Sequence, residues 1–316
     1  MEIDVNEQWI QDISQDLMKI LLSDKTTKCY IRWGSDNYAG LGAEYQADQE
    51  MKPELVTGGH ASVIQPRVLK TEEEKNSRTR EKAEVFTPSW VCNDQNNLVD
   101  AAWFGRREVF NKSYDKSWKT VPGPVQFPRD KIWKDYVDAR RLEVSCGEAP
   151  YLVSRYDTVS GAPIPVRDRI GLLDRKLRIV GENAKNEGEW MIWAVRAFQS
   201  CYGYDYQGDN VLLARENLLY TFIENMEEMW DRKPTLMEMK KIANIAAWNI
   251  WQMNGLTMTV PYSTAEPAYK QLSLFDFIDV EDDGDDKEDE VGEIPCRIFD
   301  WRSNESIEFR SMIKEG

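Results

Sequence analysis

The sequence from residue 142 reads Leu142-Glu143-Val144-Ser145-Cys146-Gly147-Glu148-Ala149-Pro150-Tyr151-Leu152. Its first residues predict a short strand, which is followed by a turn of small residues and then by an apolar pair that opens a helix. Small residues let the backbone approach a ligand closely, and amide groups at the start of a helix can bind its polar groups. The pattern is typical of a nucleotide-type loop, although an ordinary strand-to-helix turn has the same features.

Strands and helices alternate along the sequence after this loop. Helical patterns cover residues 167–183 and 189–199, and the aromatic segment 200–206 predicts a strand. A long helix is expected from Asp209, as its N-cap, to Trp230, followed by a helix over 235–253 and a strand over 256–260. This order favours a parallel α/β sheet, in which ligands bind beyond the carboxyl ends of the strands.

An N-terminal segment of different character precedes the α/β part. Residues 1–80 are expected to be helical and irregular, with an amphipathic helix over 5–22 and a short strand at 29–33. The α/β domain is expected to span 81–316. Within it, residues 279–293 hold ten acidic residues and one Lys, so this stretch is predicted to be a flexible acidic linker.

Composition limits the class of protein. With 41% hydrophobic residues and 12 Trp, the 316-residue chain can bury a sizeable core. The net charge is −15 and no dominant basic run occurs, so the chain alone is expected to bind duplex DNA weakly. Five scattered Cys and one His cannot form an ordinary zinc site, and no apolar run approaches ~20 residues. We therefore expect a cytoplasmic protein that does not interact with membranes.

The segment 142–152 resembles the first cofactor motif of the adenine-N6 DNA methyltransferases of restriction–modification systems, D-P-A-C-G-S-G-x-F-L. Cys146 and Gly147 match that motif, Glu143 takes the place of its Asp, and Tyr151 begins its aromatic–Leu pair. Two residues depart from the motif: Glu148 stands in place of its Ser, and Ala149 in place of its second Gly. The resemblance implies a Rossmann-like methyltransferase sheet with S-adenosylmethionine as cofactor, bound by Glu143, Cys146, Gly147 and Tyr151.

Three further segments resemble motifs of the same family. Phe86-Thr87-Pro88 resembles the motif that contacts the methionine end of the cofactor, although Thr-Pro is also a common helix start. Asp205 matches the acid that holds the ribose hydroxyls, with Asp209 as the competing choice. Asn254 matches a residue that touches the adenine, although Asn-Gly is also a routine turn.

The family's catalytic tetrapeptide, (N/D)-P-P-(Y/F), does not occur in the sequence. Residues 294–301 and 307–313 resemble the segment that precedes the catalytic strand, and that strand is expected after Gly316. The interpretation is a split adenine-specific DNA methyltransferase that is incomplete as a single chain and inactive alone. This subunit binds the cofactor, a separately encoded partner supplies the NPPY-type motif, and DNA is bound through the complex.

An alternative function comes from the segment Gln271-Leu272-Ser273-Leu274-Phe275, which has the form of the bacterial sliding-clamp-binding pentapeptide. In that peptide the Gln makes polar contacts, and the apolar residues, here Leu272, Leu274 and Phe275, fill a groove. The chain would then be a non-catalytic, methyltransferase-like adaptor. The same residues also fit an edge strand of the sheet. A catalytically inactive remnant whose acidic segment mimics DNA is a third possibility.

Overall fold

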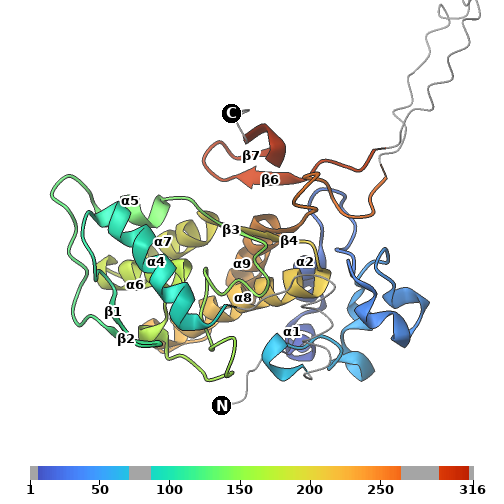
Figure 1. Cartoon of the computed structure of the whole chain (residues 1–316), viewed down its shortest axis with the longest axis horizontal. Coiled ribbons are helices and arrows are strands. Elements are labelled where there is room, and N and C mark those ends of the chain that lie inside the picture. Colours follow the sequence, from blue (N-terminus) through green and yellow to red (C-terminus); the bar gives the residue numbers. More distant parts are fainter. Residues whose placement is uncertain (1–5, 71–86, 265–291, 313–316) are drawn as a thin grey trace, which may run out of the picture.

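A three-stranded parallel sheet lies at the centre of the computed structural model, which describes residues 6–70, 87–264 and 292–312 (Figure 1). The sheet has the order β3 (Arg141–Val144), β4 (Cys201–Asp205) and β5 (Ile250–Gln252). Helices α6 (Leu172–Asn183) and α7 (Glu187–Gln199) connect β3 to β4, and α8 (Gly208–Trp230) and α9 (Leu236–Asn249) connect β4 to β5. The predicted mixed α/β class with parallel strands is confirmed.

The remaining elements flank this unit. Before the sheet come α1 (Glu7–Ile13), α2 (Gln15–Leu22), the short 3-10 helices η1 (Asp36–Leu41), η2 (Ala43–Tyr45), η3 (Pro53–Leu55), η4 (Gly58–His60) and η5 (Arg67–Leu69), then α4 (Ser89–Phe104), the antiparallel hairpin β1 (Asn111–Tyr114) and β2 (Ser117–Thr120), and α5 (Trp133–Asp138). After β3 comes η6 (Val166–Asp168), and after β5 come the antiparallel hairpin β6 (Arg297–Asp300) and β7 (Glu305–Glu308), and η7 (Phe309–Met312).

The two faces of the parallel sheet are covered differently. On one face, Cys201 and Ile250 belong to the large hydrophobic core formed with the helices, which also includes Ile10 and Leu17 of the N-terminal segment. On the other face, Tyr202 and Trp251 belong to a small separate cluster. Its remaining residues come from the chain after β5 and from β6: Met253, Val260, Cys296 and Ile298.

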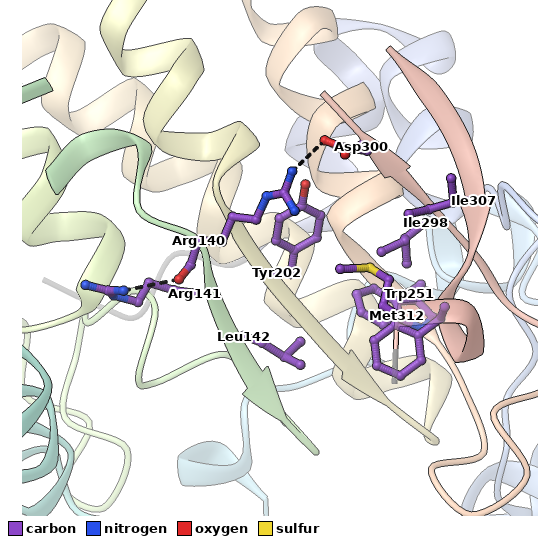
Figure 2. A pocket seen from close by; sticks show the side chains of 10 residues that line it. Arg140, Arg141, Leu142, Tyr202, Trp251, Ile298, Asp300, Ile307 and Met312 are labelled. Atoms are coloured by element: carbon purple, nitrogen blue, oxygen red, sulfur yellow. Dashed lines mark hydrogen bonds and ion pairs between the residues drawn. The ribbon is translucent and has the colours of Figure 1, made fainter. Parts of the chain in front are cut away.

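The hairpin β6–β7 covers only part of that second face. Figure 2 shows Leu142, Tyr202 and Trp251 on the sheet, with side chains of the hairpin opposite them. These residues line an apolar cavity of about 130 Å³. The hairpin does not cover β3, and as a result Leu142 is 47% exposed and Val144 is 61% exposed. Among the described residues, no strand pairs with the outer edge of β3.

Several predicted boundaries were wrong. The helix predicted over 5–22 is broken at Ser14, whose backbone is extended between α1 and α2. The helix predicted over 235–253 ends at Asn249, and its last predicted turn is strand β5. The buried guanidinium of Arg215 donates to the carbonyls of Ala247 and Ile250, which ends the helix by a tertiary contact. The strand predicted at 256–260 is a turn followed by Thr259, which forms isolated antiparallel bridges with Asn254 and with Pro295.

The structure also bears on the other sequence expectations. Within the described ranges, none of the helices combines the length and the apolar character needed to cross a bilayer. The clamp-like segment 271–275, Phe86 and most of the acidic stretch 279–293 lie outside the described residues. The clamp alternative therefore stays a prediction.

Candidate functional site

The loop after β3 has an unusual backbone. Ser145, Gly147 and Ala149 all have left-handed conformations, with φ of 50°, 53° and 63°. Only Gly adopts such angles without a steric cost, so two of the three positions are strained. Strain of this kind persists only where surrounding contacts hold the backbone, and it is concentrated at functional loops.

Asp205 at the end of β4 provides such a contact. The Gly147 N–H donates to Asp205 Oδ2 at 2.9 Å, and the Cys146 N–H donates to the Tyr204 carbonyl at 2.8 Å. The other carboxylate oxygen accepts from the Gln207 N–H at 3.0 Å and from the Asn210 amide at 3.4 Å. A carboxylate has about four acceptor positions, so Asp205 can accept about one further hydrogen bond.

The two acids considered for a sugar contact lie in different surroundings. Asp209 is fully buried, forms an ion pair with Lys70 at 3.1 Å and accepts from the Tyr38 hydroxyl at 2.7 Å. It is not the N-cap of α8, which is Gln207. Asp205 keeps 8% exposure, and burial raises its pKa although the N–H donors at Gln207 and Gly147 oppose that shift. Of the two acids, Asp205 is therefore the less enclosed.

Glu143 stabilises the far side of the loop. Its two carboxylate oxygens accept from the Tyr151 and Leu152 N–H groups at 3.2 and 3.1 Å. Burial raises the pKa of Glu143 to about 8, and the same two N–H groups oppose the shift. The helix predicted to open at Tyr151-Leu152 is absent, since residues 150–152 form only a turn. These amides therefore bind Glu143 and do not form a helix N-terminus facing a ligand.

The helix that was predicted to begin at Tyr151-Leu152 begins instead at Leu172. Helix α6 begins at Leu172, whose N–H donates to the Tyr151 carbonyl at 2.8 Å, and the next N–H donates to the Leu152 carbonyl. A Cβ at Gly171 would lie 2.2 Å from the Leu152 oxygen, so only Gly allows this approach. The helix thus starts beside the predicted place, but after a largely irregular excursion over residues 153–171.

The Thr-Pro segment lies beside the loop. Pro88 is the N-cap of α4, and the Thr87 carbonyl accepts from the Thr158 hydroxyl at 2.8 Å. Burial raises the pKa of the Tyr151 hydroxyl, and the nearby Thr87 and Cys92 also contribute to the shift. The structure therefore brings Thr87 together with the first loop. It supports the helix-start interpretation of Pro88 at the same time.

Asn254 lies at the same edge of the sheet, but its side chain binds backbone N–H groups of its own turn. The preceding residue, Met253, donates its N–H to the Asp205 carbonyl at 3.0 Å. The Asn254 side-chain oxygen accepts from the Leu256 and Thr257 N–H groups at 3.0 and 3.4 Å. This is the turn that the Asn-Gly pair predicts.

The N-terminal segment contributes to this edge in a way that the sequence pattern does not reveal. The Gln252 amide donates to the Arg32 carbonyl at 2.8 Å, and the Gly208 N–H donates to the Trp33 carbonyl at 3.0 Å. Next to them, the Ser35 hydroxyl is fully buried with no hydrogen-bond partner in the described structure. Arg67 donates its N–H to Glu148 Oε1 at 2.6 Å.

Several polar groups gather at the carboxyl end of the parallel strands. At one edge of the sheet it gathers a loop with strained backbone, a carboxylate with spare acceptor capacity and an unpaired buried hydroxyl. In the described part of the chain, no group of three or more His, Cys, Asp or Glu side chains is placed to hold a metal ion. The chemistry available at this edge is hydrogen bonding.

Comparison with known proteins gives no family for this chain. No protein-family model matches it, and neither the curated proteins nor the solved structures contain a significant match.

Proposed function

We propose that this chain binds S-adenosylmethionine as the cofactor subunit of a split adenine-specific DNA methyltransferase with a Rossmann-like sheet. The observation that carries the proposal is the Gly147–Asp205 hydrogen bond of 2.9 Å, which joins the ends of β3 and β4. Ligands of parallel α/β sheets bind at the carboxyl ends of the strands, where this contact lies. The resemblance of residues 142–152 to a methyltransferase motif supplies the choice of ligand.

Four groups of the chain are assigned to the cofactor. Asp205 accepts from a ribose hydroxyl with its remaining acceptor position, and the backbone around Gly147 faces the methionine part. Thr87 and Tyr151 border the methionine part, and the turn at Asn254 borders the adenine. When bound, S-adenosylmethionine supplies the methyl group for transfer, and these residues serve to bind and orient it.

The uncovered side of β3 supports a partner subunit. Parallel sheets are normally covered on both faces, and an exposed strand edge tends to pair with another strand. Leu142 and Val144 are apolar, exposed and on one face of the edge strand. A partner strand that pairs with β3, and carries the NPPY-type tetrapeptide at its end, would place the catalytic residues beside the loop. Other parts of the partner, packed on the same face of the sheet, would cover Leu142 and Val144.

The test is co-expression with a neighbouring reading frame that encodes an Asn-Pro-Pro-Tyr-type motif. We expect the two proteins together, and neither alone, to transfer tritium from labelled S-adenosylmethionine to adenine in duplex DNA. Val144→Lys should leave the folding of this chain unchanged but prevent co-purification of the partner. Ile192→Lys, at a residue 67% exposed on α7, is the matched control and should keep the partner. Methylation by this chain alone would refute the split arrangement.

A further inference from the structure

The hairpin β1–β2 presents a basic face to solvent. Its strands pair with Lys112 opposite Lys119 and Tyr114 opposite Ser117. Because successive side chains of a strand point to opposite sides, these four residues share one face. All four are exposed, Tyr114 to 55%. Lys116 lies in the turn between the strands and is exposed as well.

The opposite face of the hairpin is anchored to the rest of the protein. Asn111 exchanges hydrogen bonds of 3.0 and 2.7 Å with Asn93 of α4. On the second strand, the Trp118 indole donates to the Asp168 carbonyl at 2.8 Å, and the Thr120 hydroxyl donates to the Asp168 carboxylate at 2.7 Å. In Figure 1 the hairpin lies against α4, away from the N-terminal segment. The outward direction of the basic face is therefore fixed.

The charges on this face do not stabilise the hairpin itself. Two Lys side chains directly across a strand pair repel each other. Lys112 forms an ion pair with Glu108 at 3.5 Å, but both side chains are about half exposed, where such a pair contributes little. Lys116 has φ of 50°, a conformation that Gly or Asn would adopt at lower cost. The cationic side chains at these three positions are therefore available to an anionic partner.

The basic character is local. Residues 105–120 contain five basic and two acidic side chains, in a chain whose net charge is −15. Two of the five, Arg106 and Arg107, follow the end of α4 and are also exposed. A narrow two-stranded ribbon with cationic side chains on one face fits the regularly spaced phosphates of a nucleic-acid backbone.

We propose that the outward face of the β1–β2 hairpin binds the phosphate backbone of duplex DNA. The choice of duplex DNA rests on the proposed function, and the position of the hairpin agrees with it. Helix α4 carries Asn93, which holds the hairpin, and Asn96, whose amide donates to the Tyr151 carbonyl at 3.0 Å. One turn of a single helix thus connects the basic face to the loop assigned to the cofactor.

The test measures DNA binding by fluorescence anisotropy at several salt concentrations. The probe is a labelled duplex of ~20 base pairs, about two helical turns. The hairpin variant carries Lys112→Gln, Lys116→Gln and Lys119→Gln. The control variant carries Lys52→Gln, Lys185→Gln and Lys233→Gln, which are exposed positions elsewhere and change the net charge equally. Circular dichroism and thermal unfolding establish that both variants fold as the wild type does.

We expect the hairpin variant to bind at least about tenfold more weakly at low salt. The slope of log K against log salt should fall by up to about 3, close to one for each phosphate that a Lys side chain no longer neutralises. The control should bind as the wild type does. Equal binding by the two variants, no salt-dependent binding by the wild type, or tighter binding of a matched RNA duplex would each overturn the proposal. Binding of S-adenosylmethionine should be the same in both variants, so this result is separable from failure of the cofactor assignment.

Discussion

The Gly147 N–H and Asp205 Oδ2 are 2.9 Å apart, although 58 positions separate the two residues in the sequence. The contact fixes the loop after β3 against the end of β4. It also uses part of the acceptor capacity of Asp205, so this carboxylate both holds the loop and remains able to accept about one hydrogen bond from a ligand.

Gly147→Ala should weaken binding of S-adenosylmethionine by about tenfold or more. Alanine at φ of 53° costs roughly 1–2 kcal/mol, and the loop can avoid this cost only by moving away from Asp205. Gly123→Ala is the control, because Gly123 has φ of 78° with no atom near its missing Cβ. Calorimetry should show reduced affinity for the first variant alone, and equal affinities would argue against the loop as the binding site.

Asp205→Asn should lower both stability and cofactor affinity. An amide cannot accept at both of its ends, so either the Gly147 or the Gln207 N–H loses its acceptor, at a cost of about 1–3 kcal/mol. Asp24→Asn is the control, since Asp24 is a buried acid that accepts from the Thr26 and Thr27 N–H groups. Thermal unfolding should show lower stability in both variants, and calorimetry should show lower affinity only for Asp205→Asn. If Asp205→Asn binds S-adenosylmethionine as tightly as the wild type does, Asp205 does not contact the ribose.

The sequence predicts the local elements well where one pattern dominates. Strands β3 and β4 and helix α8 lie close to their predicted positions, because hydrophobic periodicity and length leave few alternatives. Strand β5 could not be predicted, because its three residues continue the helical hydrophobic pattern of α9. The helix is ended by hydrogen bonds from Arg215, which belongs to α8. No local pattern reports a contact of this kind.

The candidate site could be predicted only in part, because local sequence patterns do not report long-range contacts. The sequence identifies Gly147 and Asp205 by motif and order, and the fold places them in contact. It could not show that Glu143 binds the amides of Tyr151 and Leu152, or that α6 starts 20 residues after the turn. The sequence also could not show that Arg32 and Trp33 of the N-terminal segment lie at the strand ends, because long-range hydrogen bonds from Gln252 and Gly208 hold them there.

Gly171→Ala should be strongly destabilising. The added Cβ would lie 2.2 Å from the Leu152 carbonyl oxygen, so either the turn or the start of α6 must move. A cost of about 2 kcal/mol or more is expected, in the range for overpacked interiors. Gly188→Ala within α7 is the matched control and should be neutral or stabilising by up to ~1 kcal/mol. Similar unfolding midpoints in urea for the two variants would contradict the close approach.

Stability should fall as the pH rises from about 5 to 8. Burial raises the pKa of Glu7 from 4.5 to about 8, and the pKa of Glu216 is raised by burial and by Glu7, with Arg155 opposing. The carboxylate oxygens of both Glu residues have no hydrogen-bond partner in the described structure. The folded state therefore binds these protons more tightly than the unfolded state, and the stabilisation present at low pH is lost toward pH 8.

Glu216→Gln and Glu7→Gln should each reduce this pH dependence and raise the unfolding temperature at about pH 8, since a neutral amide has no proton to lose. Thermal unfolding across the pH range provides the measurement. Glu189→Gln, at a first-turn residue of α7 whose carboxylate accepts from the Lys185 N–H, is the control. Parallel pH profiles for the wild type and both variants of the buried pair would show that these carboxyls do not cause the effect.

Hydrogen–deuterium exchange with and without S-adenosylmethionine tests the central claim most directly. If the loop and the acid share one ligand, the cofactor should slow exchange in peptides covering residues 142–152 and in those covering 203–210, with the same concentration dependence. Peptides from the β1–β2 hairpin should not respond. Protection of neither segment at saturating cofactor, or of only one of them, would contradict the assignment.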